Sequence, residues 1–285
     1  MSNQVQDTNY HIHVDSSHSF LTFNLKETWN YRDLIWLFTK KNLLVRYKQT
    51  VLGPLWLILS PTMTSIMYTI FFGTVAGIDT EGLPKIMFYL AMNGLWSYFS
   101  IVFFRCADLF RNHAYIFGKV YFPRLVMAFS EMLVSVIEFL IQLPVLVILC
   151  VWYSFHGMAI PYITWFWIVI ILCWVGMMAM GCGILVSSFT TKYRDLRILV
   201  GYVVRLWMYA TPVVYPLSIL NPGWLRTLEL LNPLTYPMEF FRKMVLGVGG
   251  APVYSLVISV VFTVVAAVLG ILVFNKMERN FMDTV

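Results

Sequence analysis

Four polar residues share one face of a helix that the sequence predicts over about 125–151. Glu131, Ser135, Glu138 and Gln142 are separated by four, three and four positions, which places them in one stripe along an α-helix. A carboxylate at the centre of a bilayer costs at least ~2.5 kcal/mol, so such a side chain rarely faces lipid. Two kinds of chemistry fit this stripe: an ion pair with an arginine of another helix, or a relay that passes protons.

The ion pair is the simpler interpretation, because no histidine continues the stripe. Two arginines lie in or at the end of other apolar stretches, and these are Arg105 and Arg205. We expect Arg205 or Arg105 to pair with Glu131 or Glu138 inside a helix bundle. A proton relay is the alternative.

The sequence contains no evident nucleotide site or catalytic group. Gly118-Lys119 lacks the preceding glycine of a P-loop and is followed by Val120, so we expect no ATP site, no cofactor and no enzymatic activity on this chain. The four cysteines lie in or beside apolar stretches without metal-ligand spacing, which predicts small buried hydrophobes and no disulfide framework. Three histidines lie in a polar tail that offers a metal ion no rigid frame: His11, His13 and His18. We therefore expect no metal site.

The composition indicates a membrane protein. Only 12% of the residues are charged and 59% are hydrophobic, whereas a soluble domain carries about 25% charged residues. A helix needs about 20 apolar residues to cross the hydrocarbon core, and an unpaired backbone group in lipid costs several kcal/mol. We therefore predict an all-α, polytopic fold with six transmembrane helices. The six apolar stretches lie at about 51–73, 86–106, 125–151, 163–188, 198–217 and 252–274.

The distribution of lysine and arginine predicts the orientation. Fifteen of them lie before residue 51, in the connections 105–124 and 190–197, and in the C-terminal tail, against four in the connections on the opposite side. The positive-inside rule therefore places both termini in the cytoplasm. The net charge of +6 then reflects topology and not a nucleic-acid-binding patch. Residues 1–33 are polar and lack the apolar core of a signal peptide.

Two cytoplasmic segments differ from plain linkers. In residues 30–50, five apolar residues fall on one side at helical spacing, interrupted by Lys41: Leu34, Leu37, Phe38, Leu44 and Val45. We expect a helix lying on the cytoplasmic surface, with an ordinary basic anchor as the alternative. The connection 108–124 mixes apolar and charged residues and could present apolar side chains to a soluble subunit; a loop on the membrane surface is the alternative. The six-span domain of 51–274 is flanked by a polar tail at 1–29 and a cytoplasmic tail at 275–285.

The outer segment 218–250 and its approach are rich in proline. Five prolines lie between positions 212 and 237, although the segment is otherwise apolar and aromatic. Proline breaks helices, and broken helices at membrane depth occur only where protein or water covers them. We predict two short re-entrant helices, at about 218–231 and 234–246. A loop resting on the outer leaflet is the alternative.

Two predicted spans carry faces that combine aromatic and small polar side chains. Tyr202, Arg205 and Tyr209 share a face of one span, and a face of the first span contains Pro61, Thr64, Ser65, Tyr68 and Phe72. Aromatic rings can pack on the apolar faces of sugars while their edges stay wet. These faces therefore suit the wall of a sugar-conducting path. The alternative is a bundle core with an interfacial aromatic belt.

Several motifs resemble one transporter family. The stretch from Arg46 to Trp56 (RYKQTVLGPLW), with Pro61 and Phe72-Gly73 after it, is similar to the start of ABC-2 type permeases. Within that family, the stretch is similar to the permeases that export O-antigen (lipopolysaccharide), capsule and teichoic-acid polysaccharides. Three later blocks match in the same order, across roughly residues 30–280: PVVYP at 212–216, LNPLT at 231–235 and EFFR at 239–242.

The resemblance implies a homodimeric permease with two ATP-binding cassette subunits, which carry ATP and Mg²⁺. It would move a lipid-linked polysaccharide across the bacterial inner membrane, from cytoplasm to periplasm. The implied ATPase-coupling residues are Arg46, Tyr47, Lys48, Tyr115, Phe117, Lys119, Phe122 and Arg124. The implied channel residues are Tyr68, Phe72, Tyr202, Tyr209 and Tyr215. The implied periplasmic gate residues are Pro212, Pro216, Asn232, Pro233, Glu239 and Arg242.

Three other functions stay open at this point. The nearest is an ABC-2 permease for a lipid or a drug. A secondary transporter is a different class, and six spans without an obvious inverted repeat argue against it. A membrane-embedded glycosyltransferase or acyltransferase would need acidic or histidine residues grouped on one loop, and the sequence shows none.

Overall fold

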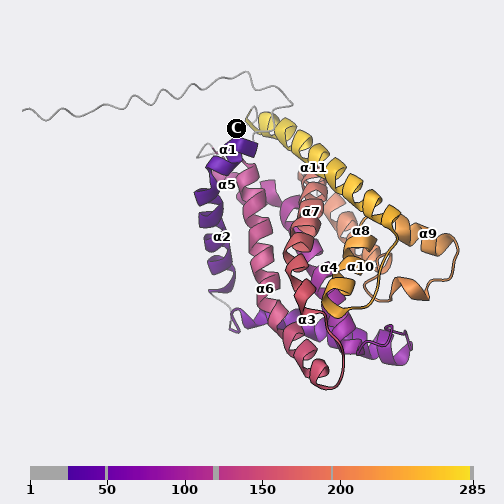
Figure 1. The fold of residues 1–285 in the computed structure, drawn as a ribbon. Coiled ribbons are helices and arrows are strands. Elements are labelled where there is room, and N and C mark those ends of the chain that lie inside the picture. The colour runs from indigo at the N-terminus through magenta and orange to yellow at the C-terminus, as the bar shows by residue number, and fades with distance from the viewer. Residues whose placement is uncertain (1–24, 49–50, 118–121, 194, 283–285) are drawn as a thin grey trace, which may run out of the picture.

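A computed structural model describes residues 25–48, 51–117, 122–193 and 195–282. Within these ranges the regular elements are all helical, which confirms the predicted all-α class. Their order is α1 (Leu25–Asn30), α2 (Arg32–Tyr47), α3 (Leu55–Tyr68), η1 (Thr69–Val75), α4 (Lys85–Ala107), α5 (Leu109–Phe117), α6 (Leu125–Phe155), η2 (Tyr162–Phe166), α7 (Trp167–Lys192), α8 (Leu196–Tyr209), η3 (Leu217–Ile219), α9 (Trp224–Leu231), α10 (Thr235–Leu246) and α11 (Val253–Met282). Figure 1 shows their arrangement.

Five helices in the described ranges are long and apolar enough to cross a membrane. They are Leu55–Val75, Lys85–Ala107, Leu125–Phe155, Tyr162–Thr190 and Val253–Val273. Each matches one of the six predicted spans.

The remaining predicted span, 198–217, is not a single long helix. α8 has 14 residues and ends at Tyr209, which gives a length of about 21 Å against a hydrocarbon core of about 30 Å. Turns follow it at residues 210–213. Pro212 and Pro216 explain this ending, since proline removes a backbone donor and disfavours helix at the residue before it.

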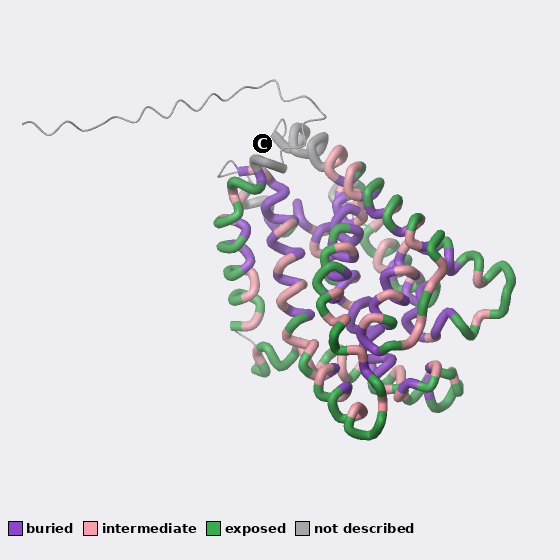
Figure 2. Tube along the Cα trace, in the orientation of Figure 1, coloured by how far each residue is buried: buried purple, intermediate pink, exposed green. Residues whose placement is uncertain are grey.

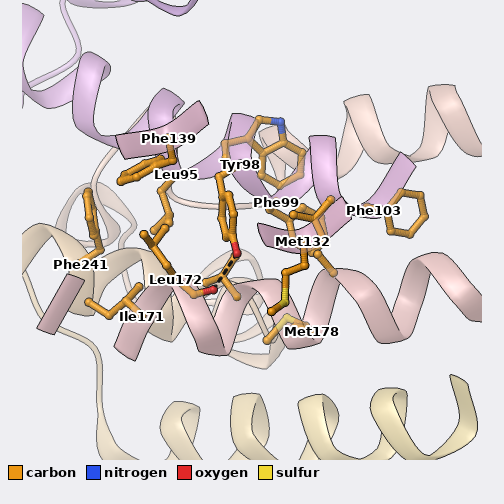
Figure 3. Packing of buried hydrophobic residues seen from close by; sticks show 14 of the residues in the cluster. Leu95, Tyr98, Phe99, Phe103, Met132, Phe139, Ile171, Leu172, Met178 and Phe241 are labelled. Carbon is orange, nitrogen blue, oxygen red and sulfur yellow. Dashed lines mark hydrogen bonds between the residues drawn. The ribbon is translucent and has the colours of Figure 1, made fainter. Parts of the chain in front are cut away.

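α4 is the central helix of the bundle. It packs against α7, α6 and α3, and most of its residues are buried, whereas few residues of the Leu55–Val75 helix are. Figure 3 shows Tyr98 and Phe99 of α4 among side chains of α6 and α7, with the Tyr98 hydroxyl donating to the Leu172 carbonyl at 2.9 Å. A helix that is apolar all round is expected in such a buried position.

α7 and α11 approach each other closely through small residues. A Cβ added at Gly181 of α7 would lie 2.7 Å from the carbonyl carbon of Ala266 in α11. A Cβ at Gly270 would lie 3.0 Å from the Gly181 oxygen. Small residues at such positions let the helix backbones pack directly, which stabilises helix pairs in lipid.

α3 and α8 expose apolar side chains along their outer faces. Figure 2 shows the exposed positions among the described residues in green. On α3 and η1 these include Leu55, Met63, Met67, Ile70 and Phe71, and on α8 they include Ile198, Leu199, Val203 and Leu206. A chain with such faces needs lipid or another apolar surface against them.

α2 is a helix as predicted, but the apolar residues grouped in the prediction do not all face the same way. It lies along α6 (Figure 1) and buries Ile35, Phe38 and Thr39. Leu37, Leu44 and Val45 point outward. The inner face of α2 is mixed, because it combines Ile35 and Phe38 with Thr39 and Asn42, whose side chains donate hydrogen bonds to α6.

Candidate functional site

A cluster of buried charges lies where α2, α4, α5 and α6 meet. Glu131 and Glu138 of α6 are 5% and 4% exposed. Arg105, near the end of α4, places Nη2 2.6 Å from Oε2 and 2.8 Å from Oε1 of Glu138. Its Nη1 donates to the Ser135 hydroxyl at 2.7 Å, and its Nε lies 3.8 Å from Oε2 of Glu131. Arg105 of α4 therefore binds the polar stripe on α6.

α2 supplies a second set of partners to the same two glutamates. Asn42 donates to Oε1 of Glu131 at 2.9 Å, and the Tyr47 hydroxyl donates to Oε1 of Glu138 at 2.8 Å. Arg46 lies 3.6 Å from Glu131 and 3.4 Å from Glu138. Burial, together with the charge of Glu138, raises the pKa of Tyr47, so the phenol keeps its proton and remains a donor.

α5 reaches the cluster through His113. Its Nε2 lies 3.7 Å from Oε1 of Glu131, and its Nδ1 lies 3.2 Å from the Leu109 carbonyl oxygen. Burial lowers the pKa of His113 against the opposing charge of Glu131. We name these residues the ion cluster: Asn42, Arg46, Tyr47, Arg105, His113, Glu131, Ser135 and Glu138.

Of the two arginines that the sequence offered, the structure brings Arg105 to the glutamates and leaves Arg205 outside the ion cluster. Arg205 is exposed on α8, with its guanidinium carbon 5.9 Å from the centre of the Tyr202 ring. The two arginines and two glutamates of the ion cluster balance in charge. The structure therefore contains the predicted ion pair, with Arg105 as its arginine, and it also adds a histidine, His113, to the polar stripe of α6.

Sequence reasoning missed Asn42 and His113, and it gave Arg46 and Tyr47 no role beyond coupling. One signal was available, since Asn42 and Arg46 are four residues apart and share a face of α2. For His113 the spacing along the chain gave no signal.

The predicted coupling residues of the connection 108–124 are only partly described. Phe122 is buried against Phe38, with ring centres 5.7 Å apart, and Arg124 is buried as well. Phe122 therefore packs against α2, and neither side chain is exposed in the described structure, while the coupling role of both stays a prediction. α5 contains Tyr115 and Phe117, whose side chains lie outside the described parts, as does Lys119. Lys48 is exposed.

A second charged cluster joins the predicted gate to the connection between η1 and α4. Arg242 of α10 is 1% exposed, and its Nη2 lies 2.6 Å from Glu239 and 3.1 Å from Glu81. Glu239 also accepts hydrogen bonds from the backbone N–H groups of Gly250 and Leu217. Burial raises the pKa of Glu239 against the opposing charge of Arg242. We call Glu81, Glu239 and Arg242 the outer cluster.

Asn232 connects α8 to the gate helices. Its Oδ1 accepts from the Trp207 indole at 3.0 Å and from the Leu234 N–H at 3.1 Å, and its amide donates to the Thr211 hydroxyl at 2.8 Å. Nearby, the Tyr215 hydroxyl donates to Oε2 of Glu229 at 2.7 Å. Burial raises the pKa of Glu229 to about 7.

The three predicted gate prolines separate these elements. Pro212 lies in the turns after α8, Pro216 precedes η3, and Pro233 lies between α9 and α10.

The predicted channel residues lie on α3, η1, α8 and the turn that follows α8. The Tyr68 hydroxyl donates to the Met208 sulfur at 3.4 Å, and the rings of Tyr68 and Phe72 are 5.6 Å apart. Tyr202 and Tyr209 are exposed on one face of α8, as their spacing predicts. Tyr215 is half-buried through its bond to Glu229.

Comparison with known proteins decides the family. The model of the family described as ABC-2 type transporter matches residues 33–246, which cover most of this chain. The chain belongs to the ABC-2 type transporter family. The matched range of this ABC-2 chain contains both the ion cluster and the outer cluster.

Curated relatives of this ABC-2 chain share a name. The O-antigen export system permease protein RfbA of Klebsiella pneumoniae is 28% identical over 257 residues, which cover 88% of this chain and 94% of the relative. The protein of the same name from Myxococcus xanthus is 26% identical over 225 residues, which cover 77% of this chain and 83% of the relative. The matches extend over nearly the whole length of these proteins. They support a multi-pass membrane permease.

Proposed function

We propose that this chain is the permease subunit of an ATP-driven exporter that moves a lipid-linked polysaccharide of the O-antigen type out of the cytoplasm. The observation that carries the proposal is the match to O-antigen export permeases over 88% of the chain. The exposed aromatic side chains of α8 agree with a sugar substrate, because aromatic rings pack on sugars without fixed hydrogen-bond geometry. Successive sugar units could then slide past.

The proposed assembly is a homodimer with two ATP-binding cassette subunits, in the bacterial inner membrane and with both termini in the cytoplasm. The exposed apolar faces of α3 and α8 are suited to contact a second copy or lipid. ATP and Mg²⁺ would bind to the partner subunits, because the sequence contains no P-loop.

The ion cluster supports a route for force from the partner subunits to the spans. α2 and α5 are the elements proposed to meet the ATPase, and both contact Glu131 of α6 through side chains. Arg105 ties the same helix α6 to α4 at the centre of the bundle. A push on α2 would therefore act on α6 and α4 through directional, charge-assisted bonds, which are about twice as strong as neutral ones.

The outer cluster supports the proposed gate. Arg242 links α10 to Glu81, more than 150 positions earlier in the chain, and Glu239 links it to the turn at Leu217. Opening of a path on this side would have to break these bonds or move their elements as one unit. In the first case the outer cluster belongs to the closed state of the gate, and in the second it holds α10 and its neighbours together as the gate moves.

Deletion of the gene, followed by complementation, tests the proposal. We expect the deletion strain to lose surface polysaccharide and to accumulate lipid-linked polysaccharide inside the cell, measured by glycan-stained gels of surface and cytoplasmic fractions. Normal surface polysaccharide in the deletion strain would refute it and would favour a permease for a lipid or drug.

Purification of the tagged permease tests the partners. An ATPase should co-purify, and transport in liposomes should need ATP. Transport driven by an ion gradient alone would instead indicate a secondary transporter.

A further inference from the structure

A cavity of about 280 Å³ with mixed polar and apolar walls lies between α2, α3, α4 and α6, next to the ion cluster. Its walls include Trp56 and Ser60 of α3, Asn93 and Ser97 of α4, and Gln142 of α6. Along α4 it extends from Asn93 to Arg105, a distance of about 18 Å. Because α3, α4 and α6 are candidate spans, this cavity brings polar groups to membrane depth, where an unsatisfied group costs several kcal/mol.

Several lining groups are open for hydrogen bonds. Within the described part of the chain, the side chains of Trp56, Ser97 and Gln142 make no hydrogen bond to protein. Gly94 keeps the Gln142 amide at the cavity wall, since a Cβ there would lie 3.1 Å from Nε2 of Gln142. An indole N–H, a hydroxyl and an amide thus offer both donors and acceptors to an occupant.

The charges around the cavity favour a neutral occupant. Among the lining residues that the structure describes, Arg105 is the one cation, and both oxygens of Glu138 already bind it. A phosphate group would therefore meet no uncommitted positive charge here and would face the Glu138 carboxylate. This argues against a phospholipid headgroup and for hydroxyl groups.

Trp56 gives the cavity an apolar wall. Its indole is about half exposed and lines the cavity together with Leu57 and Pro61. A sugar ring has an apolar C–H face and a rim of hydroxyls, which is the combination that an aromatic wall beside polar groups recognises. The volume lies just below the range of about 300–1,000 Å³ for drug-sized ligands, and this suits a single sugar unit.

We propose that this cavity binds one neutral sugar unit, with its ring against Trp56 and its hydroxyls bonded to Ser97 and Gln142. The proposal rests on the proposed export function for its substrate class. The sugar unit could belong to the exported chain or to the headgroup of a membrane glycolipid, and both share this chemistry.

Photo-crosslinking in cells tests the proposal and separates the two sources. A benzophenone amino acid replaces Ser60 in the cavity, in a variant that still exports, and the same group at Ile170 on the exposed side of α7 is the control. We expect a glycan-positive adduct at position 60 and none at position 170. An adduct of broad, high mass that disappears in a strain unable to make the polysaccharide assigns the sugar to the exported chain. A discrete small adduct that persists in that strain assigns it to a glycolipid.

Substitutions at two lining residues, with a control on the exposed face of α6, sharpen the test. Gln142→Leu should lower the glycan adduct at position 60 about fivefold, the effect of one lost hydrogen bond. Trp56→Ala should lower it more than Trp56→Phe, which keeps an aromatic wall. Leu140→Ala on the exposed face of α6 should leave the yield unchanged.

An adduct at position 60 that contains only phospholipid, or no glycan above the control, would overturn the proposal. If the deletion strain still loses its surface polysaccharide in that case, the export function stands and only the cavity assignment fails.

Discussion

Replacement of Arg105 by methionine removes the cation nearest to Glu138. The two side chains are 12% and 4% exposed, and their closest atoms are 2.6 Å apart. Loss of one partner from a buried pair typically costs about 3–5 kcal/mol, because the other charge stays buried without compensation. Arg46 also lies 3.4 Å from Glu138 and compensates in part. We therefore expect a loss near the lower limit, about 3 kcal/mol.

Thermal unfolding of the purified permease in nanodiscs measures this loss. A change of about 3 kcal/mol corresponds to a fall of roughly 6–12 °C in the unfolding midpoint for a chain of this size class. Arg205→Met is the matched control, because Arg205 is exposed on α8 and lies outside the ion cluster. Its midpoint should change by no more than about 1–2 °C, as expected for a surface substitution within ±0.5 kcal/mol.

The double variant Arg105→Met/Glu138→Met separates a pair from two independent residues. An apolar replacement of the whole pair is often neutral, so the double variant should recover much of the lost stability. Two results would refute the reasoning. One is a fall for Arg205→Met as large as that for Arg105→Met. The other is a double variant no more stable than Arg105→Met alone.

Three further predictions concern other parts of the chain. Gly249→Ala places a Cβ 2.5 Å from Nε of the buried Arg242, at a φ of +108°. This strain should reduce the free energy of unfolding by about 1–3 kcal/mol and so lower the unfolding midpoint. Burial raises the pKa of Glu229 from 4.5 to about 7, so the folded state favours the protonated carboxyl. The stability that this group contributes is complete below about pH 4.5 and is lost as the pH rises through about 7. The unfolding midpoint of the wild type should therefore fall across this range, and Glu229→Gln should make that fall smaller. Arg46→Glu sets a third carboxylate beside the ion cluster and should reduce polysaccharide export more than membrane insertion, whereas the exposed Lys40→Glu should reduce neither.

Each of these three has a result that contradicts it. Gly201→Ala, where an added Cβ meets nothing within 4 Å, is the control for Gly249→Ala, and equal midpoints for the two would remove the steric argument. Parallel pH curves for the wild type and Glu229→Gln would show that Glu229 titrates outside this window. Equal losses of insertion and export in Arg46→Glu would mean that the basic segment is only an anchor.

The positions of the spans could be predicted because they depend on local properties of the chain. An apolar run of about 20 residues must form a helix in lipid whatever it packs against. The same reasoning did not predict the break in the helix at 198–217, where the run is apolar enough but contains Pro212 and Pro216. Here backbone chemistry outweighs hydropathy, and α8 ends at Tyr209.

The partners within the site could not be chosen from the sequence, because they depend on which helix faces meet. Arg105 and Arg205 are equivalent as arginines in apolar stretches. Only the packing of α4 against α6 brings Arg105 to Glu138, and only the contact with Phe38 of α2 explains why Phe122 is buried. Such contacts depend on the register between helices, which a single sequence does not contain.

The ion cluster and the cavity are not independent parts of the molecule. Tyr47, Arg105, Ser135 and Glu138 belong to both. A shift of α2 that lengthens the bond from Tyr47 to Glu138 would change one wall of the cavity and remove one donor from its base. The same shift would leave Arg105 as the main partner of Glu138 and so change the link between α4 and α6. Force applied to α2 and the fit of a sugar in the cavity would then act on the same carboxylate, which is a direct physical way for ATP-driven motion to release a bound sugar unit.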